Sequence, residues 1–323
     1  MTPKRVLVVG SNGLLGQRLT DLLVRGTDYK ILLCSLAEKP VRDMTSTEYR
    51  QMDITSKKQV KRVVFGFEPD VIVNAAGMTN VDACETERER AWRTNVEGVE
   101  NLVEAARRNN AKIFHVSTDY IFDGKAGPYV ETDRPEPLGY YGKTKLAAEN
   151  VLRASGLEFF IARTIVLYGY AVHVRPNFAL WLIQNLEKKS SVRIVDDQMG
   201  NPTFADDLAY GLLKAIELGK SGIFNIAGRD IMSRHEFALR VAKVFEFDPT
   251  LITPIKTQDL DQPAMRPLQS GLITLKAEIE LGYKPSTVEQ GLAILKSQIS
   301  MTMRRMADSA PVPGGTQGRH LRR

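Results

Sequence analysis

A tyrosine and a lysine, Tyr141 and Lys145, stand four residues apart in the sequence. On a helix this spacing places both side chains on one face. A phenol has an unperturbed pKa of about 10, and a nearby ammonium stabilises the phenolate. Such a pair can therefore pass a proton to a reacting oxygen or accept one from it. The spacing alone is common and usually marks a surface pair, so its interpretation depends on what accompanies it.

Polar segments follow two neighbouring apolar runs that are typical of buried strands. Thr118 and Asp119 follow one run, and Asn74 and Ala75 end the preceding one. Ligands of open α/β sheets bind at the carboxyl ends of parallel strands. These segments therefore favour a catalytic interpretation of the tyrosine and the lysine.

A glycine-rich turn follows a four-residue apolar run, residues 6–9, at the start of the chain. Glycines here let the backbone approach a pyrophosphate, and the next helix offers unpaired N–H groups and a positive dipole end. The G-x-x-G-x-x-G spacing differs by one residue from the fingerprint of the larger dehydrogenases, and a turn that only packs helix against strand is the alternative. We expect the turn to bind a nicotinamide dinucleotide through Gly10, Ser11, Asn12, Gly13, Leu14, Leu15 and Gly16.

The end of the second strand bears on the choice between NADP and NAD. In NAD-preferring folds an acid at this point binds the ribose 2′-hydroxyl. Here no acid precedes Glu38, while Lys39 and Arg42 are near enough in sequence to meet a 2′-phosphate. The pattern favours NADP, with NAD as the alternative. The other predicted cofactor contacts are Ser35, Asp53 (for which an N-cap role is the alternative), Ile54, Ala75, Ala76, Tyr141 and Lys145.

Short apolar runs that alternate with amphipathic stretches must position these residues. We predict strands over 6–9, 31–34, 71–74, 113–117 and 159–164, and helices over 14–23, 57–65, 87–108 and 141–154. This alternation predicts right-handed βαβ units and a parallel sheet that is covered on both faces. The expected fold class is α/β, a doubly wound Rossmann sheet with a smaller, interleaved C-terminal substrate lobe.

The chain divides into two parts and a tail. Residues 1–165 and 201–230 are expected to form the NAD(P)-binding domain, and 166–200 and 231–300 the substrate-binding lobe. Residues 301–323 are predicted to be a disordered basic tail, because their last part has almost no apolar residues. This tail holds five basic residues and one acid, so the rest of the chain is close to neutral although the total charge is +6. The charge therefore argues against nucleic-acid binding.

The two cysteines, Cys34 and Cys84, lack metal-ligand spacing, and the four histidines are scattered. We therefore predict idle thiols in a reducing compartment and no metal. The first apolar run ends at Gly10, which is too short for a signal peptide or a membrane span. We expect a soluble, cytoplasmic protein without a membrane partner.

Several separated motifs occur in an order that resembles a known family. They lie at residues 73–85, 117–124, 141–145, 197–203 and 266–270. To about residue 300 the chain resembles the extended short-chain dehydrogenase/reductases, and within them the dTDP-4-dehydrorhamnose reductase branch. The resemblance implies a nucleotide-sugar substrate, and analogy with the fold implies a homodimer.

The resemblance also implies residue roles. Tyr141 would protonate the carbonyl oxygen of a 4-keto sugar, Thr118 would hydrogen-bond that oxygen, and Lys145 would hold the nicotinamide ribose and lower the pKa of the tyrosine. The implied substrate residues are Thr118, Asp119, Tyr120, Asn177 and Arg266, with Arg163 and Arg175 as further candidates for a diphosphate. Asn95 would support the hydrogen bonds of the site, or serve only as a helix-interior residue.

Two departures from related patterns leave alternatives open. Asp119-Tyr120 lacks the second carboxyl that sugar-nucleotide dehydratases carry, so reduction fits better than dehydration, while epimerisation stays open. Val166 stands where rhamnose-forming reductases commonly have a tryptophan, so the sugar or nucleotide could differ; Trp181 could replace that surface or pack in the core. The non-catalytic alternative is a regulatory subunit resembling the methionine adenosyltransferase β subunit, and a third is binding of nucleic acid or membrane through the tail.

Overall fold

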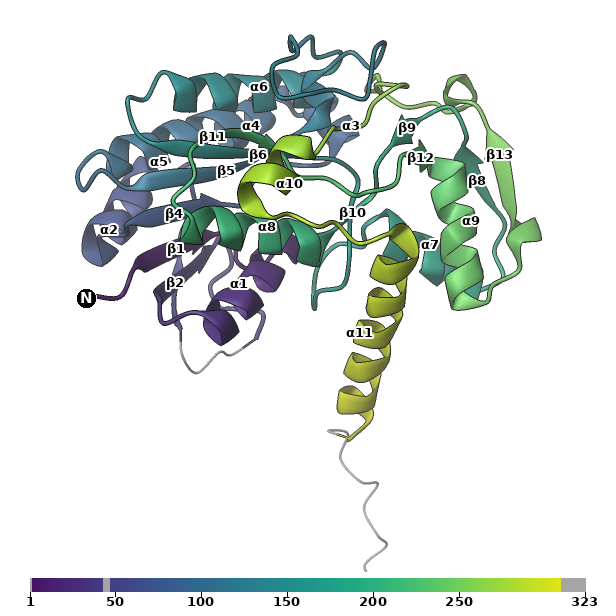
Figure 1. The fold of residues 1–323 in the computed structure, drawn as a ribbon, viewed down its shortest axis with the longest axis horizontal. Coiled ribbons are helices and arrows are strands. Elements are labelled where there is room, and N and C mark those ends of the chain that lie inside the picture. Colours follow the sequence, from purple (N-terminus) through teal and green to yellow (C-terminus); the bar gives the residue numbers. More distant parts are fainter. Residues whose placement is uncertain (1, 43–46, 309–323) are drawn as a thin grey trace, which may run out of the picture.

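A seven-stranded parallel sheet lies at the centre of the fold (Figure 1). The computed structural model describes residues 2–42 and 47–308, with side chains described as far as Thr302. The strand order is β11-β6-β5-β4-β1-β2-β3, which confirms the predicted α/β class with a doubly wound sheet. The strands are β1 (Arg5–Val9), β2 (Lys30–Ser35), β3 (Glu48–Gln51), β4 (Val71–Asn74), β5 (Lys112–Thr118), β6 (Phe159–Thr164) and β11 (Gly222–Asn225).

Both faces of the sheet are buried under helices. Val6 and Val8 of β1 join a core cluster with α1, α8 and α10, whereas Leu7 and Val9 join a second cluster with α2, α5 and α6. Because alternate residues face opposite cores, every position of the strand must be apolar, which explains the unbroken apolar run. The covering helices are α1 (Leu14–Gly26), α2 (Lys57–Phe67), α5 (Gly98–Ala106), α6 (Tyr140–Arg153), α8 (Ala205–Glu217) and α10 (Leu275–Leu281).

The predicted helix over 87–108 is interrupted in the structure. It consists of α4 (Arg88–Trp92), a π-helical turn η1 (Arg93–Glu97) and α5. A short helix that the sequence analysis did not predict, α3 (Val81–Thr86), precedes it and is capped by Asn80. The π-turn places Asn95 toward α6, and such turns occur frequently at functional sites.

A smaller lobe packs at one end of the sheet (Figure 1). Its own core lies between α7 (Phe178–Glu187), α9 (Arg234–Phe245), α11 (Val288–Asp308) and the pair β8 (Val192–Val195) and β13 (Ile252–Ile255). Ser233 begins α9 with a capping box to Glu236. Two short strand pairs complete the lobe: β7 (Leu167–Tyr168) with β10 (Thr203–Phe204), and β9 (Met199–Gly200) with β12 (Met232–Ser233). Single 3-10 turns lie at Asp119–Ile121 (η2), directly after β5, and at Pro249–Leu251 and Thr257–Asp259.

The C-terminal part differs from the prediction in two places. Residues 231–300 were expected in the lobe, but Ala277, Leu281 and Tyr283 return to the core beneath the sheet. The tail was expected to be disordered from residue 301, but α11 continues to Asp308. The apolar residues of this segment repeat at helical spacing, a pattern that its average composition does not reveal. The rest of the predicted tail, residues 309–323, lies outside the described residues.

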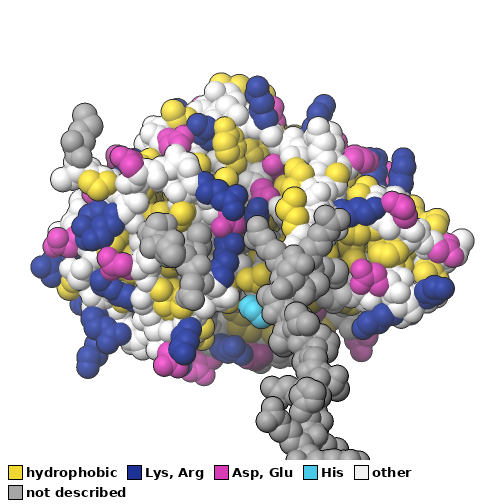
Figure 2. Space-filling model, turned by 90° about the horizontal axis from the view of Figure 1, so that it is seen from below, with side chains coloured by type: hydrophobic (Ala, Val, Ile, Leu, Met, Phe, Trp, Pro, Cys, Tyr) yellow, Lys and Arg dark blue, Asp and Glu magenta, His cyan; other side chains and the backbone are white. Residues whose placement is uncertain are grey.

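On the face drawn in Figure 2, charges of one sign do not dominate the described surface. Lys and Arg are interspersed there with Asp and Glu. Among the described helices, α11 included, none is both long and apolar enough to cross a bilayer.

Candidate active site

The glycine turn and the tyrosine–lysine pair open onto one cleft at the carboxyl ends of β1, β4 and β5. A part of about 1010 Å³ lies beside the glycine turn, and an adjoining part of about 650 Å³ lies beside Tyr141. The two parts share Gly13, Ala75, Ala76 and Gly77. A dinucleotide in the first part can therefore end beside Tyr141 at the entrance of the second.

The glycine turn has the close approaches that a phosphate-binding turn requires. Gly10 has a φ of +82°, and a Cβ there would lie 2.7 Å from the Ala76 nitrogen. A Cβ on Gly16 would collide with the carbonyl oxygen of Gly10. Helix α1 begins at Leu14, and its N-cap, Gly13, has no side chain to bond the first N–H groups. The bare backbone and open helix terminus fit a diphosphate.

Ser11 and Asn12 face away from this cleft although both belong to the predicted cofactor turn. Ser11 Oγ donates to the Cys34 carbonyl at 3.1 Å, and Asn12 Nδ2 donates to the Lys39 carbonyl at 3.0 Å. Their side chains position the segment after β2, whereas Leu14 and Leu15 line the part of the cleft beside Tyr141. Any contact of Ser11 or Asn12 with a ligand would come from the backbone.

We expect Gly16→Ala to destabilise the fold by about 1–3 kcal/mol, because an added methyl must displace the Gly10 carbonyl in a packed turn. It should also weaken dinucleotide binding, since that carbonyl belongs to the turn. Gly26→Ala, at the other end of α1, is the matched control because its new methyl would meet nothing within 4 Å. Urea unfolding and fluorescence titration with NADPH measure both effects; equal behaviour of the two variants would contradict the account.

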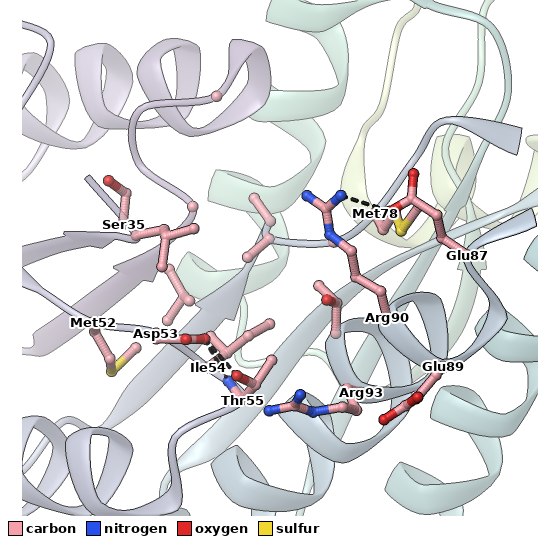
Figure 3. Close-up of a pocket in the computed structure, with 18 of the residues that line it drawn as sticks. Ser35, Met52, Asp53, Ile54, Thr55, Met78, Glu87, Glu89, Arg90 and Arg93 are labelled. Atoms are coloured by element: carbon pink, nitrogen blue, oxygen red, sulfur yellow. Dashed lines mark hydrogen bonds and ion pairs between the residues drawn. The ribbon is translucent and has the colours of Figure 1, made fainter. Parts of the chain in front are cut away.

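Ser35, Asp53 and Ile54, predicted from the sequence as cofactor contacts, line the part of the cleft beside the glycine turn (Figure 3). Ser35 Oγ lies 2.7 Å from the hydroxyl of Tyr49. Asp53 accepts hydrogen bonds from the backbone and hydroxyl of Thr55, both at 2.9 Å. It is not the N-cap of α2; Ser56 holds that position.

Arg42, one of the two basic residues expected near a 2′-phosphate, is placed differently. Arg42 donates to Asp21 at 2.6 Å and to the Gln17 carbonyl, so it is held against α1 instead of the cleft. Three other arginines, Arg88, Arg90 and Arg93, line the part of the cleft beside the glycine turn. Figure 3 shows Arg90 and Arg93 across from the end of β2. Arg90 is paired with Glu87.

Tyr141 and Lys145 are both buried on the first turns of α6, at the inner wall of the cleft. Burial raises the pKa of Tyr141 above its usual value, although a hydrogen bond with Thr118 opposes that rise. Burial lowers the pKa of Lys145 to about 8, with Glu149 and Cys84 acting in the opposite direction. The phenol is therefore protonated at neutral pH, as a proton donor must be. Burial is the largest influence on the pKa of Tyr141, and the lowering of this pKa by Lys145 that the resemblance implies stays a prediction.

Asn95 ties the segment after β4 to α6. Its Oδ1 accepts from the Met78 N–H at 2.7 Å, and its Nδ2 donates to the Met78 carbonyl and to Thr144 Oγ1. It therefore supports the hydrogen bonds of the site, as the resemblance implied, and holds the helix that carries Tyr141 and Lys145.

The predicted substrate residues line the second part of the cleft: Thr118, Asp119, Tyr120, Asn177 and Arg266. Asn177 is the N-cap of α7, and its Nδ2 also donates to the Gly169 carbonyl at 2.7 Å, so both ends of its amide are engaged. Arg266 binds both carboxylate oxygens of Asp82 at 2.7 Å.

Three further arginines were considered as ligand contacts or lie near the predicted substrate residues. Arg234, at the start of α9, and Arg175 also line this part of the cleft; Arg234 forms no ion pair among the described residues, but its charge acts on Asp119 and it hydrogen-bonds Tyr120. Arg163, expected as a further diphosphate candidate, is instead 1% exposed and bonded to Glu149 through Nε and Nη2. It is a structural residue and cannot reach a ligand.

Asp119 should make stability depend on pH. Burial raises the pKa of this carboxyl to about 6, although Ser270 donates to it at 2.7 Å. The folded protein thus binds the proton more tightly than the unfolded chain, where the carboxyl titrates near 4. Its contribution to stability is complete below about pH 4 and is lost as pH rises through about 6. Relative to Asp119→Asn, the wild-type free energy of unfolding should therefore fall between these values; parallel urea-denaturation curves would argue against this.

Comparison with known proteins places the chain in a family. The model of the RmlD substrate binding domain family matches residues 4–300. The chain belongs to this family. A dTDP-4-dehydrorhamnose reductase of Aggregatibacter actinomycetemcomitans is 35% identical, over 91% of this chain and 98% of that protein. The dTDP-4-dehydrorhamnose reductase of Mycobacterium tuberculosis is 31% identical over 83% of this chain and 84% of its own length.

Solved structures agree with the RmlD family assignment. A dTDP-4-dehydrorhamnose reductase from Clostridium acetobutylicum superposes with a TM-score of 0.83 at 31% identity, covering 92% of this chain and 100% of that one. A dTDP-4-dehydrorhamnose reductase from Bacillus anthracis, solved in complex with NADP, gives 0.79 at 26% identity with the same coverage.

Val166, at the position where the sequence lacks the expected tryptophan, lies in the cleft of this RmlD family member. It lines the second part of the cleft with a φ of +47°, a left-handed conformation that strains a β-branched residue. Its carbonyl accepts from the Thr203 N–H at 3.1 Å, which holds the turn before β7. Trp181 is 40% exposed, packs on Phe178 and does not line the cleft, so it neither replaces the missing tryptophan surface nor lies in the core.

Arg234 lines the second part of the cleft and Gln17 supports the glycine turn, but neither residue was predicted from the sequence. Gln17, 3% exposed, donates to the Asn12 and Val172 carbonyls and accepts from the Val172 N–H, which ties the glycine turn to the loop before α7. A glutamine on the first turn of a helix carries no sequence signal for this contact. Arg234 follows a recognisable N-cap, but only the pairing of β12 with β9 brings it to the cleft.

Proposed function

We propose that this protein is an NADPH-dependent reductase of the 4-keto group of a nucleotide-linked 6-deoxy sugar, with dTDP-4-dehydrorhamnose as its substrate. The observation that carries the proposal is the burial of Thr118, Tyr141 and Lys145 on the wall of the second part of the cleft, which adjoins the part proposed for the dinucleotide. The reductase relatives, at 35% and 31% identity over most of the chain, support the same reaction.

The residues of the glycine turn fit a dinucleotide. A Cβ on Gly10 or Gly16 would collide with neighbouring backbone atoms, so glycine keeps this turn tight, and the N-terminus of α1 is open. When bound, reduced nicotinamide supplies a hydride to the carbonyl carbon. The absence of an acid at the end of β2 favours NADPH over NADH, and the relative solved with NADP supports this choice. Of the arginines that line this part of the cleft, Arg88 and Arg90 are paired with carboxylates, so Arg93 is proposed to take the role expected for Arg42.

The side chains account for the remaining steps of a reduction. As hydride reaches the carbonyl carbon, the C=O π electrons move to the oxygen, and Tyr141 gives its phenolic proton to that oxygen. Thr118 Oγ1 donates a hydrogen bond to the same oxygen and positions it. The Lys145 ammonium stabilises the phenolate that remains until a solvent proton replaces the one that was lost.

The residue after Asp119 argues for reduction and against dehydration. Elimination of water needs an acid and a base on the sugar, and Tyr120 occupies the position of a second carboxyl. The Tyr120 ring instead packs edge-on against Tyr141 with centroids 5.7 Å apart. Beside Tyr141 the pocket therefore offers the Asp119 carboxylate and a phenol donor, while the Asp82 carboxylate in the same part of the cleft is paired with Arg266.

Arg234 and Arg175 are proposed to bind the diphosphate of the nucleotide sugar, because both line the cleft and neither forms an ion pair among the described residues, although the charge of Arg234 acts on Asp119. We expect Arg234→Gln to raise KM for the nucleotide sugar by roughly tenfold with a much smaller change in kcat. Arg193→Gln, on the exposed side of β8, should change neither. An unchanged KM in the Arg234 variant would remove this residue from the substrate site.

The test of the proposed function follows NADPH or NADH absorbance with dTDP-4-keto-6-deoxyglucose and its 3,5-epimerase. Oxidation that needs both the sugar and the protein, and is faster with NADPH, supports the proposal. Cofactor binding without turnover would contradict it and would favour an epimerase or a regulatory subunit. The proposal also includes a cytoplasmic homodimer, and light scattering on the purified protein checks the dimer.

A further inference from the structure

A buried histidine lies directly behind Lys145. His115, on β5, is 1% exposed, and its Nε2 is 3.1 Å from Lys145 Nζ. Its Nδ1 is 3.2 Å from Nδ2 of Asn74, its register partner on β4. Lys145 Nζ also donates to the Val116 carbonyl at 2.6 Å. The imidazole therefore bridges the end of β4 and the proton-transfer pair.

The backbone fixes the orientation of the Asn74 amide. The Ala76 N–H, which can only donate, lies 3.1 Å from Asn74 Oδ1. The amide oxygen is thus occupied, and Nδ2 faces the imidazole. Because Nδ2 can also only donate, His115 Nδ1 must accept and carries no proton.

The single proton of the neutral imidazole must then lie on Nε2. Burial, together with the charge of Lys145, lowers the pKa of His115 well below its usual value, so the ring is neutral at physiological pH. Nε2–H points at Lys145 Nζ. Two donors cannot share a hydrogen bond, so this contact forms when Lys145 is an amine whose lone pair accepts.

We propose that His115, held in one tautomer by Asn74, is a positioning residue that sets the charge state of Lys145 by presenting a donor that favours the amine over the ammonium. Its kinetic consequence rests on the proposed reductase function, whereas the tautomer is a property of the chain itself. Asn74 and His115 also connect the loop that carries Ala75 and Ala76, in the part of the cleft proposed for the cofactor, to Lys145 beside the proton donor Tyr141.

The other ionisable groups around Lys145 act in the opposite direction. Glu149, one turn further along α6, and Cys84, on α3, favour the ammonium, while burial lowers the pKa of Lys145 to about 8. Because the ammonium stabilises the Tyr141 phenolate, turnover should fall as pH rises through this value. The donor on His115 should place that fall at a lower pH than burial alone would.

The tautomer can be measured without any assay of activity. The chain has four histidines, so ¹⁵N-histidine labelling gives a simple NMR spectrum, and His115→Gln identifies the resonances of this ring. We expect the buried ring to show a protonated Nε2 and an unprotonated Nδ1 at neutral pH. A proton on Nδ1, or on both nitrogens, would overturn the inference.

The kinetic part is tested with Asn74→Asp. A carboxylate at this position accepts Nδ1–H, which moves the imidazole proton away from Nε2 and leaves that nitrogen free to accept from the ammonium. The alkaline limb of the kcat–pH profile should therefore move upward by about one pH unit.

The matched control is the same substitution in the His115→Gln background, where the new carboxylate acts on Lys145 only through space. The shift should be clearly smaller there, and equal shifts in the two backgrounds would overturn the inference. Thermal unfolding shows whether each variant is folded. If the proposed reduction itself fails, the NMR measurement on the wild-type chain still decides the tautomer.

Discussion

Tyr141→Phe should lower kcat for the proposed reduction by a factor of roughly 10³, since general acid catalysis contributes about 10²–10⁴. The variant removes one hydroxyl from a buried ring that packs against Tyr120 and lies beside Cys84 and Ala91. The ring packing is unchanged, so the substitution removes the proton donor with little effect on the shape of the cleft. Steady-state oxidation of NADPH at saturating substrate measures the loss.

The control for this result is dinucleotide binding. Tyr141 lines only the second part of the cleft, whereas the glycine turn that is proposed to bind the diphosphate is untouched. The affinity for NADPH should therefore change only a few-fold, and the melting temperature should stay close to that of the wild type. A variant that keeps kcat within a few-fold of the wild type would contradict the assignment of Tyr141 as proton donor.

Glu149→Gln should destabilise the protein by about 3 kcal/mol. Glu149 and Arg163 are 0% and 1% exposed, and the carboxylate accepts from two Arg163 nitrogens, from Ser117 and from Arg153. Removing one partner of a buried ion pair leaves the other charge uncompensated in a medium that solvates it poorly. Urea unfolding at neutral pH measures the difference.

Two controls separate burial from charge in this prediction. Glu217→Gln breaks the more exposed pair with Lys214 on α8 and should change stability little. Glu149→Leu with Arg163→Met removes both buried charges and should recover much of the stability that Glu149→Leu loses alone. A double variant that is less stable than the single one would show that the cost does not come from the uncompensated arginine.

The parts of the fold that local patterns determine could be predicted from the sequence. The strands over 71–74 and 159–164 match β4 and β6, because buried parallel strands need unbroken apolar runs. The meeting of the glycine turn with Thr118, Tyr141 and Lys145 at one cleft could also be predicted. Each of these segments follows a parallel strand, and the carboxyl ends of parallel strands lie at the same edge of the sheet.

Contacts between distant segments could not be predicted. Arg163 resembled a free cation because its partner, Glu149, lies on the preceding helix and only packing shows that both are buried. Arg266 finds Asp82 across 184 positions of sequence. The bond between Asn74 and His115 depends on the register of β4 against β5, which the hydrophobic pattern of two fully buried strands does not specify.

The central claim is that this chain delivers hydride to the carbonyl carbon at position 4 of a nucleotide-linked sugar. The most direct measurement supplies NADPH deuterated at C4 of the nicotinamide, together with dTDP-4-keto-6-deoxyglucose and the 3,5-epimerase, and locates the label by mass spectrometry and proton NMR. We predict one deuterium in the sugar, bound at C4 beside a new hydroxyl. A sugar without deuterium, or with deuterium at another carbon, would contradict the account.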